Sequence, residues 1–230
     1  MRLSILLPIF DEREKLEENL PKIYEAARKF GDFEIIVAED GSTDGSKELA
    51  ESFSRRLKRV RVISKKERRG RGAALKDAIR LARGKTICYM DIDLSVPLKF
   101  MDSAIYEVEH GAKFVTGSRY VHGSKIRRSP YRWISSRSYN LILKLLFDSK
   151  VHDHQCGFKF WDAKFLKGSI RDVKDNRWFF DSELILRSER KGIEIVELPV
   201  EWRENDNSKV RASDISYFLA QALRLRFTTG

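Results

Sequence analysis

The sequence of 230 residues is long enough for one α/β domain with a substantial core, and it has no Pro-, Gly- or Ser-rich linker that would divide it. Its formal net charge of +11 indicates an anionic partner, which leaves nucleic acid, a phosphorylated substrate or an anionic membrane surface as candidates. The two cysteines, Cys88 and Cys156, have a spacing that suits neither a zinc knuckle nor a disulfide framework, and this favours a reducing compartment.

Segments with strand-like and helix-like patterns alternate along the first half of the chain. We expect strands near residues 2–8, 33–39, 59–64, 85–91 and 113–117, with helices near 12–29, 43–56, 70–83 and 97–110 between them. The second half is less regular, with expected helices near 131–147, 180–191 and 213–227 and a strand near 193–199. This alternation predicts an α/β fold with a mostly parallel sheet and flanking helices.

Acidic residues follow three of the expected strands. Glu12 follows the first, Asp40 the second, and Asp91 and Asp93 lie where the fourth one ends. Since the carboxyl ends of parallel strands share one edge of a sheet, where open α/β sheets bind ligands, we expect a single acidic edge. In an extended segment Asp91 and Asp93 point to the same face, where they can share Mg²⁺ or Mn²⁺, ions that complete their coordination with water and phosphate.

Short motifs, in order along nearly the whole chain, carry a family resemblance. The first four are P-I-F-D-E at 8–12, A-E-D-G-S-T-D-G at 38–45, G-R-G-A-A-L-K at 70–76 and M-D-I-D-L-S-V-P at 90–97. The later three are T-G-S-R-Y at 116–120, D-H-Q-C-G-F-K-F at 153–160 and F-F-D-S-E-L at 179–184. Together they resemble the inverting GT-A glycosyltransferases of family 2, in the branch of dolichyl-phosphate mannose synthase and dolichyl-phosphate β-glucosyltransferase. Phe10-Asp11 stands where Tyr-Asn is commoner in that family, and Glu39 where a second Asp is usual, so these departures concern the nucleotide base.

The resemblance implies a GT-A, Rossmann-like fold in a single domain spanning 1–230. The donor half would be 1–120, and 121–230 would form an acceptor half with helices at the membrane interface. The implied reaction is inverting transfer of a hexose from a nucleoside diphosphate sugar to dolichyl or another polyprenyl phosphate, with Mg²⁺ or Mn²⁺ as cofactor. The motif D-H-Q-C-G-F-K-F favours UDP-glucose slightly over GDP-mannose as the donor.

The resemblance also implies candidate donor-site residues. Asp91 and Asp93 would hold the metal, Phe10 would stack on the base, and Asp40 would accept a hydrogen bond from the base or the ribose. For Glu12, capping of the following helix competes with contact to the donor. The whole donor set is Pro8, Phe10, Glu12, Ala38, Asp40, Asp91, Ile92, Asp93 and Lys209.

The implied acceptor decides what catalysis requires. A lipid monophosphate is already largely ionised near neutral pH, because its second pKa is about 6, so its oxygen can attack without a general base. The protein then has to hold two anionic substrates together, a task that suits the guanidinium fork of arginine. Arg119 is the first candidate, whereas Asp181 would either orient a substrate or supply negative charge at a helix N-terminus. The acceptor set is Arg119, Arg128, Arg132, Ser136 and Arg137, and the catalytic set is Asp91, Asp93, Arg119 and Asp181.

Two helical segments of the second half favour contact with a membrane surface. The segment 131–147 is broadly apolar with arginines on its amino side, and the C-terminal segment repeats apolar residues at helical spacing ahead of Arg224 and Arg226. Packing on the sheet is the alternative for both, and for the C-terminal segment the two interpretations are balanced. No apolar run approaches the roughly 20 residues that a transmembrane helix needs. We therefore expect a cytoplasmic protein that is peripheral on the cytoplasmic face of a membrane.

Functions of other classes fit the sequence less well. A sugar-nucleotide pyrophosphorylase would carry a Gly-rich loop after the first strand, where this chain has P-I-F-D-E. A non-catalytic adaptor would explain the charge but not three acidic strand ends. No RNA-recognition, KH or zinc-finger pattern supports nucleic acid as the partner. His152 and His154 flank Asp153 without a third ligand at zinc spacing.

Overall fold

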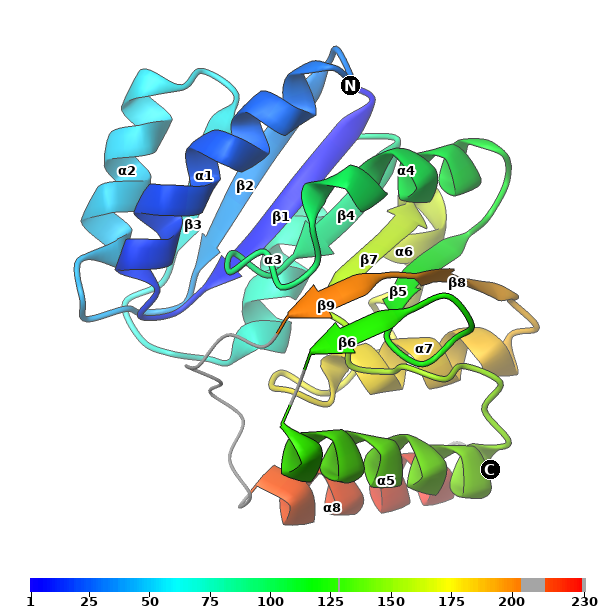
Figure 1. Ribbon diagram of the computed structural model, residues 1–230. Helices are drawn as coiled ribbons and strands as arrows, with labels where there is room; N and C mark the ends of the chain where they lie inside the picture. The colour runs from blue at the N-terminus through cyan, green and yellow to red at the C-terminus, as the bar shows by residue number, and fades with distance from the viewer. Residues whose placement is uncertain (128, 204–213, 229–230) are drawn as a thin grey trace.

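A seven-stranded sheet forms the centre of the structure, a computed structural model that describes residues 1–127, 129–203 and 214–228 (Figure 1). The strand order is β3–β2–β1–β4–β7–β5–β8, and all of these strands except β7 run in one direction. Their bounds are β1 (Leu3–Ile9), β2 (Phe33–Glu39), β3 (Val60–Ser64), β4 (Thr86–Met90), β5 (Phe114–Ser118), β7 (Phe158–Asp162) and β8 (Ile195–Pro199).

Alternate side chains of the central strands enter two separate cores. In β1, Leu3, Ile5 and Leu7 pack into one core, and Leu6 packs into the other. Because helices cover both faces, the central strands consist almost entirely of apolar residues. The helices of the first face are α1 (Arg13–Arg28), α2 (Ser46–Arg56) and α4 (Met101–Glu109), which follows the short helix η1 (Leu98–Phe100). Those of the second face are α3 (Arg71–Leu81), α6 (Ala163–Ser169) and α7 (Phe180–Arg190).

Two further helices, α5 (Pro130–Phe147) and α8 (Asp214–Thr228), lie side by side as an additional layer next to α7 (Figure 1). A third small core joins them to α7 and consists of Leu143, Phe179, Leu186, Phe218, Ala222 and Leu225. Two short strands, β6 (Lys125–Arg127) and β9 (Glu201–Arg203), form a separate parallel pair. Within the described ranges, no helix combines the length and the apolar character that crossing a bilayer requires.

The predicted α/β fold is confirmed, and the expected helices and strands of the first half match the observed ones closely. The main difference is β7, a strand that is not among the predicted elements and that runs antiparallel between β4 and β5. It contains the buried Lys159 among aromatic residues, so its pattern is not that of an ordinary core strand. Since β7 and β8 complete the sheet, the predicted division at residue 120 falls within a continuous sheet.

Candidate active site

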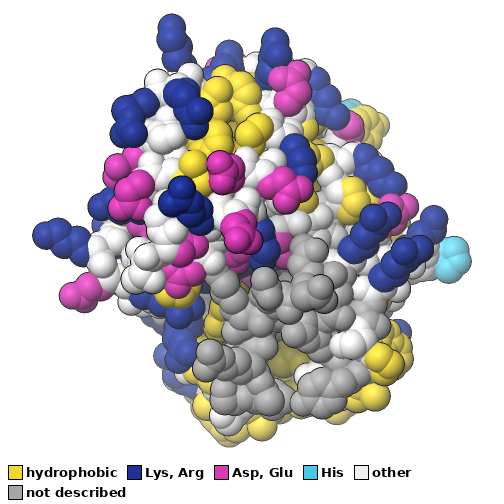
Figure 2. Space-filling view, turned by 60° about the vertical axis from the view of Figure 1, so that its left-hand side comes forward, with side chains coloured by type: hydrophobic (Ala, Val, Ile, Leu, Met, Phe, Trp, Pro, Cys, Tyr) yellow, Lys and Arg dark blue, Asp and Glu magenta, His cyan; other side chains and the backbone are white. Residues whose placement is uncertain are grey.

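The carboxyl ends of β1, β2 and β4 meet at one edge of the sheet. β7 begins at this edge as well, because Phe158 pairs with Met90 in the antiparallel β4–β7 ladder. The loop that precedes β7 therefore lies beside the residues that follow β4. Figure 2 shows acidic side chains near the middle of one face of the molecule, with lysines and arginines spread around them.

Asp91 and Asp93 lie in a tight turn and not in an extended segment. β4 ends at Met90, and the backbone N–H of Leu94, at φ 52°, donates to the carbonyl oxygen of Asp91 at 3.1 Å. Asp93 Oδ1 accepts a hydrogen bond of 2.9 Å from the backbone N–H of Ser95, which fixes this carboxylate in the turn. The expectation of an extended segment is thus wrong, because the chain turns immediately after β4, but both carboxylates remain at the same strand end.

Asp91 lies in an environment that favours a cation. Burial raises its pKa, the Arg71 guanidinium opposes this effect, and the negative charges of Asp93 and Asp181 raise the pKa further. The net pKa lies above the usual range for an aspartate. A cation bound between these carboxylates would therefore be stabilised by several negative charges.

The loop before β7 leaves room for the Asp91 carboxylate. The backbone N–H of Asp91 donates to the carbonyl oxygen of Gly157 at 3.0 Å. A Cβ atom at Gly157 would lie 1.8 Å from Asp91 Oδ2, so a side chain there would force this carboxylate to turn away. The glycine of the motif D-H-Q-C-G-F-K-F therefore allows the Asp91 carboxylate to occupy its present position.

Arg71, which is absent from the predicted site sets, forms an ion pair with Asp91. It is the first residue of α3, and its guanidinium carbon lies 5.1 Å from the ring centroid of Tyr89 and 5.7 Å from that of Trp178. The sequence signal available for it is the G-R-G turn at a helix start, which is too common to assign a role. Only the packing of α3 against this edge brings Arg71 to Asp91.

Asp181, near the start of α7, has two partners in the interior. The Tyr89 hydroxyl donates to Asp181 Oδ1, and Lys159 Nζ lies 3.6 Å from the same atom. Burial and the adjacent Asp181 carboxylate raise the pKa of Tyr89 well above its usual value, so that the phenol remains a hydrogen-bond donor. Asp181 thus occupies the predicted edge and is held there by a phenol and an ammonium group.

Four of the predicted donor residues line one small pocket of about 50 Å³. Its walls come from β1, the loop after it, the end of β2 and the start of α3. The lining residues are Pro8, Ile9, Phe10, Glu12, Asp40, Arg68, Arg71, Ala74 and Trp178. Besides Asp91 and Asp93, the remaining described members of the set are Ala38 and Ile92, whose buried side chains belong to the hydrophobic cores.

Two contacts determine the shape of this pocket. The Arg68 guanidinium carbon lies 3.8 Å from the ring centroid of Phe10, on the aromatic face that was predicted to stack on the base. Asp40 accepts hydrogen bonds of 2.8 Å from the backbone N–H groups of both Arg69 and Gly70. Asp40 therefore anchors the loop that carries Arg68 over Phe10.

Glu12 does not cap the helix that follows it. As the N-cap residue of α1 it makes no side-chain cap hydrogen bond, and its carboxylate pairs with Lys15 at 2.9 Å. The capping interpretation is therefore wrong, because the side chain lies along the first turn and lines the pocket instead of accepting from the helix N–H groups.

Arg119, the predicted acceptor-phosphate residue, forms a two-pronged ion pair with Asp153. Its Nε and Nη2 atoms donate to the two carboxylate oxygens, each at 2.7 Å, and both side chains are buried. Although burial opposes ionisation, the guanidinium holds the pKa of Asp153 below its usual range. The fork predicted to bind a phosphate therefore already binds a carboxylate from the loop before β7.

A ladder of alternating arginine and aromatic side chains extends from this pair to α5. Arg119 lies 5.4 Å from the ring centroids of both Trp202 and Tyr120, and Arg137 lies 5.1 Å from Tyr120 and 4.9 Å from Trp133. At one end, Trp202 lines a small cleft that Asp91 and Gly157 also line. The ladder therefore connects the metal turn, which is the turn that contains Asp91 and Asp93, to the amino half of α5.

Ser136 and Arg137, two predicted acceptor residues, lie on this ladder. The Ser136 and Tyr120 hydroxyls are hydrogen-bonded to each other. Arg128 and Lys209 lie outside the described residues, as does the side chain of Arg132. Of the predicted acceptor set, the structure thus brings Arg119, Ser136 and Arg137 together through Tyr120.

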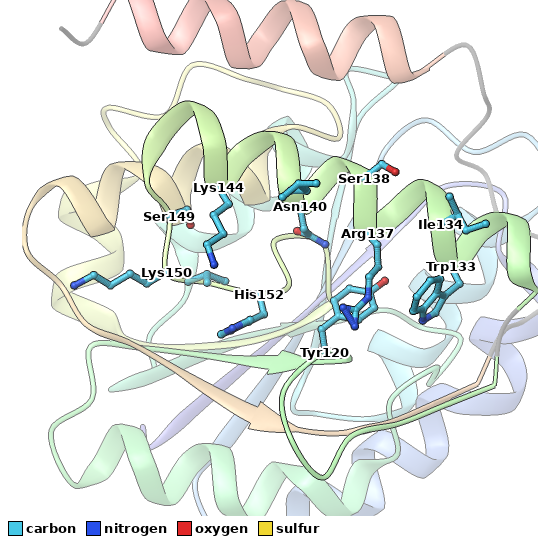
Figure 3. A pocket seen from close by; sticks show the side chains of 12 residues that line it. Tyr120, Trp133, Ile134, Arg137, Ser138, Asn140, Lys144, Ser149, Lys150 and His152 are labelled. Atoms are coloured by element: carbon cyan, nitrogen blue, oxygen red, sulfur yellow. The ribbon is translucent and has the colours of Figure 1, made fainter.

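An apolar pocket of about 430 Å³ adjoins the ladder beneath α5 (Figure 3). Figure 3 shows Arg137, Trp133 and Tyr120 together near one end and Lys144, Lys150 and His152 toward the other. The lining residues are Tyr120, Trp133, Ile134, Arg137, Ser138, Asn140, Leu141, Lys144, Ser149, Lys150, Val151 and His152. An apolar cavity bordered by cations suits a ligand with an apolar chain and an anionic group.

The mostly parallel sheet with helices on both faces and an acidic turn at a strand end has the fold of the GT-A class. A family model described as glycosyl transferase family 2 matches residues 4–168, so this chain belongs to that family and is a glycosyltransferase. The motif resemblance is confirmed at this level.

Curated relatives extend the likeness over most of the chain. The glycosyltransferase AglD of Haloferax volcanii is 34% identical over 91% of this chain, which spans only 34% of AglD. The dolichyl-phosphate beta-glucosyltransferase ALG5A of Trichomonas vaginalis is 28% identical over 92% of this chain and 68% of its own length. The dolichyl-phosphate beta-glucosyltransferase of Dictyostelium discoideum is 28% identical over 98% of this chain and 74% of its own length.

Solved structures share the fold at low sequence identity. Glucosyl-3-phosphoglycerate synthase from Mycobacterium tuberculosis, in complex with Mn²⁺, UDP and glucosyl-3-phosphoglycerate, gives a TM-score of 0.72 at 16% identity, over 99% of this chain and 79% of that one. The mannosyltransferase PcManGT from Pyrobaculum calidifontis, in complex with GDP-Man and Mn²⁺, gives 0.64 at 18% identity, over 99% of this chain and 63% of that one.

Proposed function

We propose that this glycosyltransferase moves a hexose from a nucleoside diphosphate sugar to dolichyl or another polyprenyl phosphate, with inversion at the anomeric carbon. The observation that carries the proposal is the connection between the metal turn and the ladder. Trp202 lines the cleft of Asp91 and also packs on Arg119, so the donor side and the cation-rich acceptor side adjoin. The named activities of the dolichyl-phosphate glucosyltransferase relatives support the acceptor class.

A divalent cation, Mg²⁺ or Mn²⁺, fits the donor set that Asp91 and Asp93 offer. In the part of the chain that the structure describes, no group of three or more His, Cys, Asp or Glu side chains is arranged to hold a metal. Two carboxylates at a strand end suit a hard cation that takes its other ligands from phosphate and water. When bound, the cation would neutralise negative charge on the departing diphosphate. The Mn²⁺ in the two structural neighbours supports this choice of cofactor.

We infer UDP-glucose as the donor, with GDP-mannose as the competing candidate. The aromatic face of Phe10 suits stacking on a base, and Arg68 has to leave that face before a base can occupy it. Asp40 uses its carboxylate to hold the loop of Arg69 and Gly70, so it shapes the nucleotide pocket through the backbone. The glucosyltransferase relatives and the UDP-bound neighbour support UDP-glucose.

On the acceptor side, the phosphate of a lipid would attack without a general base. Arg137 and Ser136 lie where the ladder reaches α5, and the adjoining apolar pocket has room for the first part of an isoprenoid chain. Asp181 is held by the Tyr89 hydroxyl and lies 3.6 Å from Lys159 Nζ, which suits a positioning role better than proton abstraction. Arg119 would act by holding Asp153 and supporting Tyr120 rather than by contact with the phosphate alone.

The α5–α8 layer supports a peripheral position on an anionic membrane. Leu145 on α5 is 76% exposed and Phe227 on α8 is 82% exposed, together with other apolar residues of these helices. The further exposed members are Trp133, Ile134, Leu141, Leu219 and Leu223. An apolar helix face on a chain of net charge +11 suits the interface of an anionic membrane.

The test is release of nucleoside diphosphate by the purified protein with polyprenyl phosphate, Mn²⁺ and either UDP-glucose or GDP-mannose. We expect UDP release that needs both the lipid phosphate and the metal and that EDTA abolishes. Equal or faster turnover of GDP-mannose would reassign the donor. Absence of transfer, or pyrophosphate release from a nucleoside triphosphate instead, would contradict the proposed reaction.

The role of Asp181 needs a separate measurement. Turnover should follow ionisation of the acceptor phosphate and flatten above pH ~7, whichever residue stands at position 181. A controlling ionisation that is insensitive to the acceptor's own pKa and disappears in Asp181→Asn would identify Asp181 as the base.

A further inference from the structure

The start of α3 is fixed firmly at the acidic edge. The carbonyl oxygen of Asn176 accepts a hydrogen bond from the backbone N–H of Ala73 at 3.0 Å. A Cβ atom at Gly70 would lie 2.3 Å from that same oxygen, and one at Gly72 would lie 2.8 Å from Phe180 Cβ. Both glycines allow the backbone of α3 to approach the segment before α7. The backbone of Arg71, the residue between them, is therefore held in a fixed position at this edge.

The Arg71 guanidinium contacts Asp91, one of the two carboxylates proposed to hold the metal. It is paired with Asp91, lies between the rings of Tyr89 and Trp178, and its side chain is only 17% exposed. Among the described residues, its buried Nε has no hydrogen-bond partner. A guanidinium held by one carboxylate, with an unused N–H donor, can donate a hydrogen bond to a further anionic oxygen.

Arg71 and a divalent cation would compete for the negative charge of the Asp91 carboxylate. Arg71 pairs with Asp91 Oδ1, and a cation on the same carboxylate would lie within a few ångströms of the guanidinium, where repulsion in a partly buried site is strong. Binding of the cation at Asp91 therefore favours departure of Arg71 from this carboxylate. The donor diphosphate supplies the compensating negative charge, since its oxygens are good partners for a released guanidinium.

We propose that Arg71 is a built-in counter-ion of the metal site that moves from Asp91 to the donor diphosphate when the metal binds. This inference rests on the proposed metal role of Asp91 and Asp93. It makes binding of the metal and of the nucleotide mutually dependent: the cation alone binds weakly, and the cation with a nucleoside diphosphate binds tightly. By thermodynamic linkage, the diphosphate likewise binds tightly only with the cation.

The test measures Mn²⁺ binding by the full chain, through the loss of the free-ion EPR signal, with and without UDP. The variant is Arg71→Met, which replaces the apolar stem of the side chain and removes the charged guanidinium. We expect this variant to bind Mn²⁺ alone at least ten times more tightly than the unaltered protein does. We also expect UDP to improve its Mn²⁺ affinity much less, because the diphosphate has lost its guanidinium partner. Neither measurement depends on turnover.

The matched control is Arg69→Met, which removes a neighbouring arginine that pairs with Asp77 and leaves Asp91 untouched. It should bind Mn²⁺ as the unaltered protein does. If Arg71→Met does not fold, Arg71→Lys provides the same test, because an ammonium lacks the fork and should be displaced several-fold more easily. Mn²⁺ affinity that is unchanged in the folded Arg71 variant, while UDP still promotes binding in the unaltered protein, would overturn the counter-ion role alone. No Mn²⁺ binding to the unaltered protein even with UDP would overturn the metal site as well.

Discussion

Tyr89 of β4 and Lys159 of β7 are paired residues of neighbouring strands, and both reach one carboxylate, Asp181 of α7. Lys159 Nζ also donates to the carbonyl oxygens of His154 and Cys156, at 3.2 and 2.5 Å. These carbonyls belong to the loop that packs Gly157 on Asp91 and presents Asp153 to Arg119. A single buried ammonium group thus supports both the donor side and the acceptor side of the candidate site.

Lys159→Met should destabilise the fold by about 3 kcal/mol, because it leaves buried acceptors and the Asp181 carboxylate without their cation. The free energy of unfolding from urea titration measures this effect. Lys164→Met, at an exposed position of α6, is the matched control and should change stability by less than about 0.5 kcal/mol. A loss as small as that of the control would show that the buried ammonium is not what holds the loop.

Asp93→Asn should abolish metal-dependent donor binding and nearly all transfer while leaving stability almost unchanged. Asparagine retains an Oδ1 atom that can accept from the backbone N–H of Ser95, so the turn should persist. Calorimetry with UDP and Mn²⁺ measures the binding, and thermal unfolding measures the stability. Asp102→Asn, which alters an exposed pair with Lys29, should change neither quantity. Full turnover of Asp93→Asn after EDTA treatment and Mn²⁺ replenishment would remove Asp93 from the metal site.

Arg119→Lys should lower both stability and transfer. Lysine keeps the charge but cannot bind both oxygens of the buried Asp153, and a loss of about 1–3 kcal/mol is typical for such a contact. The affinity for the donor should change little, since Arg119 lies on the acceptor side of the site and does not line the donor pocket. Unfolding titrations and UDP calorimetry on the same preparation separate the effects. Unchanged stability together with lost transfer would favour direct phosphate contact.

His154 should make the fold sensitive to mild acid. Burial lowers its pKa to about 3, whereas an unfolded histidine titrates near 6.5, so below that pH the unfolded state binds the extra proton. Stability should therefore fall as the pH decreases from 6.5 toward 3. Between pH 7.5 and 5, the unaltered protein should lose about 2 kcal/mol more than His154→Gln does. His152→Gln, at an exposed position, is the control. Parallel pH curves for His154→Gln and the unaltered protein would contradict this.

Exposed apolar residues of the α5–α8 layer should attach the protein to anionic liposomes. The double variant Leu145→Ser, Phe227→Ser should float less with the vesicles while unfolding at the same temperature, because both side chains are mostly in water. Tyr106→Ser, on α4, removes an exposed aromatic ring elsewhere and should float normally. Binding should weaken as salt screens the net charge. Indifference to both salt and the double substitution would place the docking surface elsewhere.

The sequence by itself determined the α/β class, the alternation of the first half and the acidic character of the strand ends. These features depend on local patterns, since apolar strands, helix periodicity and the residues that end each strand are all readable within a few positions. Asp91, Asp93 and Asp40 were found in this way. The motifs also led to the family, because several of them occur in the expected order along the chain.

Only the tertiary structure decided which groups pair at the edge. The insertion of β7, antiparallel, between β4 and β5 brings Gly157 to Asp91 and Asp153 to Arg119, and no local pattern specifies that order of strands. Arg71 likewise reaches Asp91 across 20 positions of sequence because glycines let α3 pack closely. Ion pairs between distant residues depend on how the layers pack, and this packing decided that the Arg119 fork holds a carboxylate.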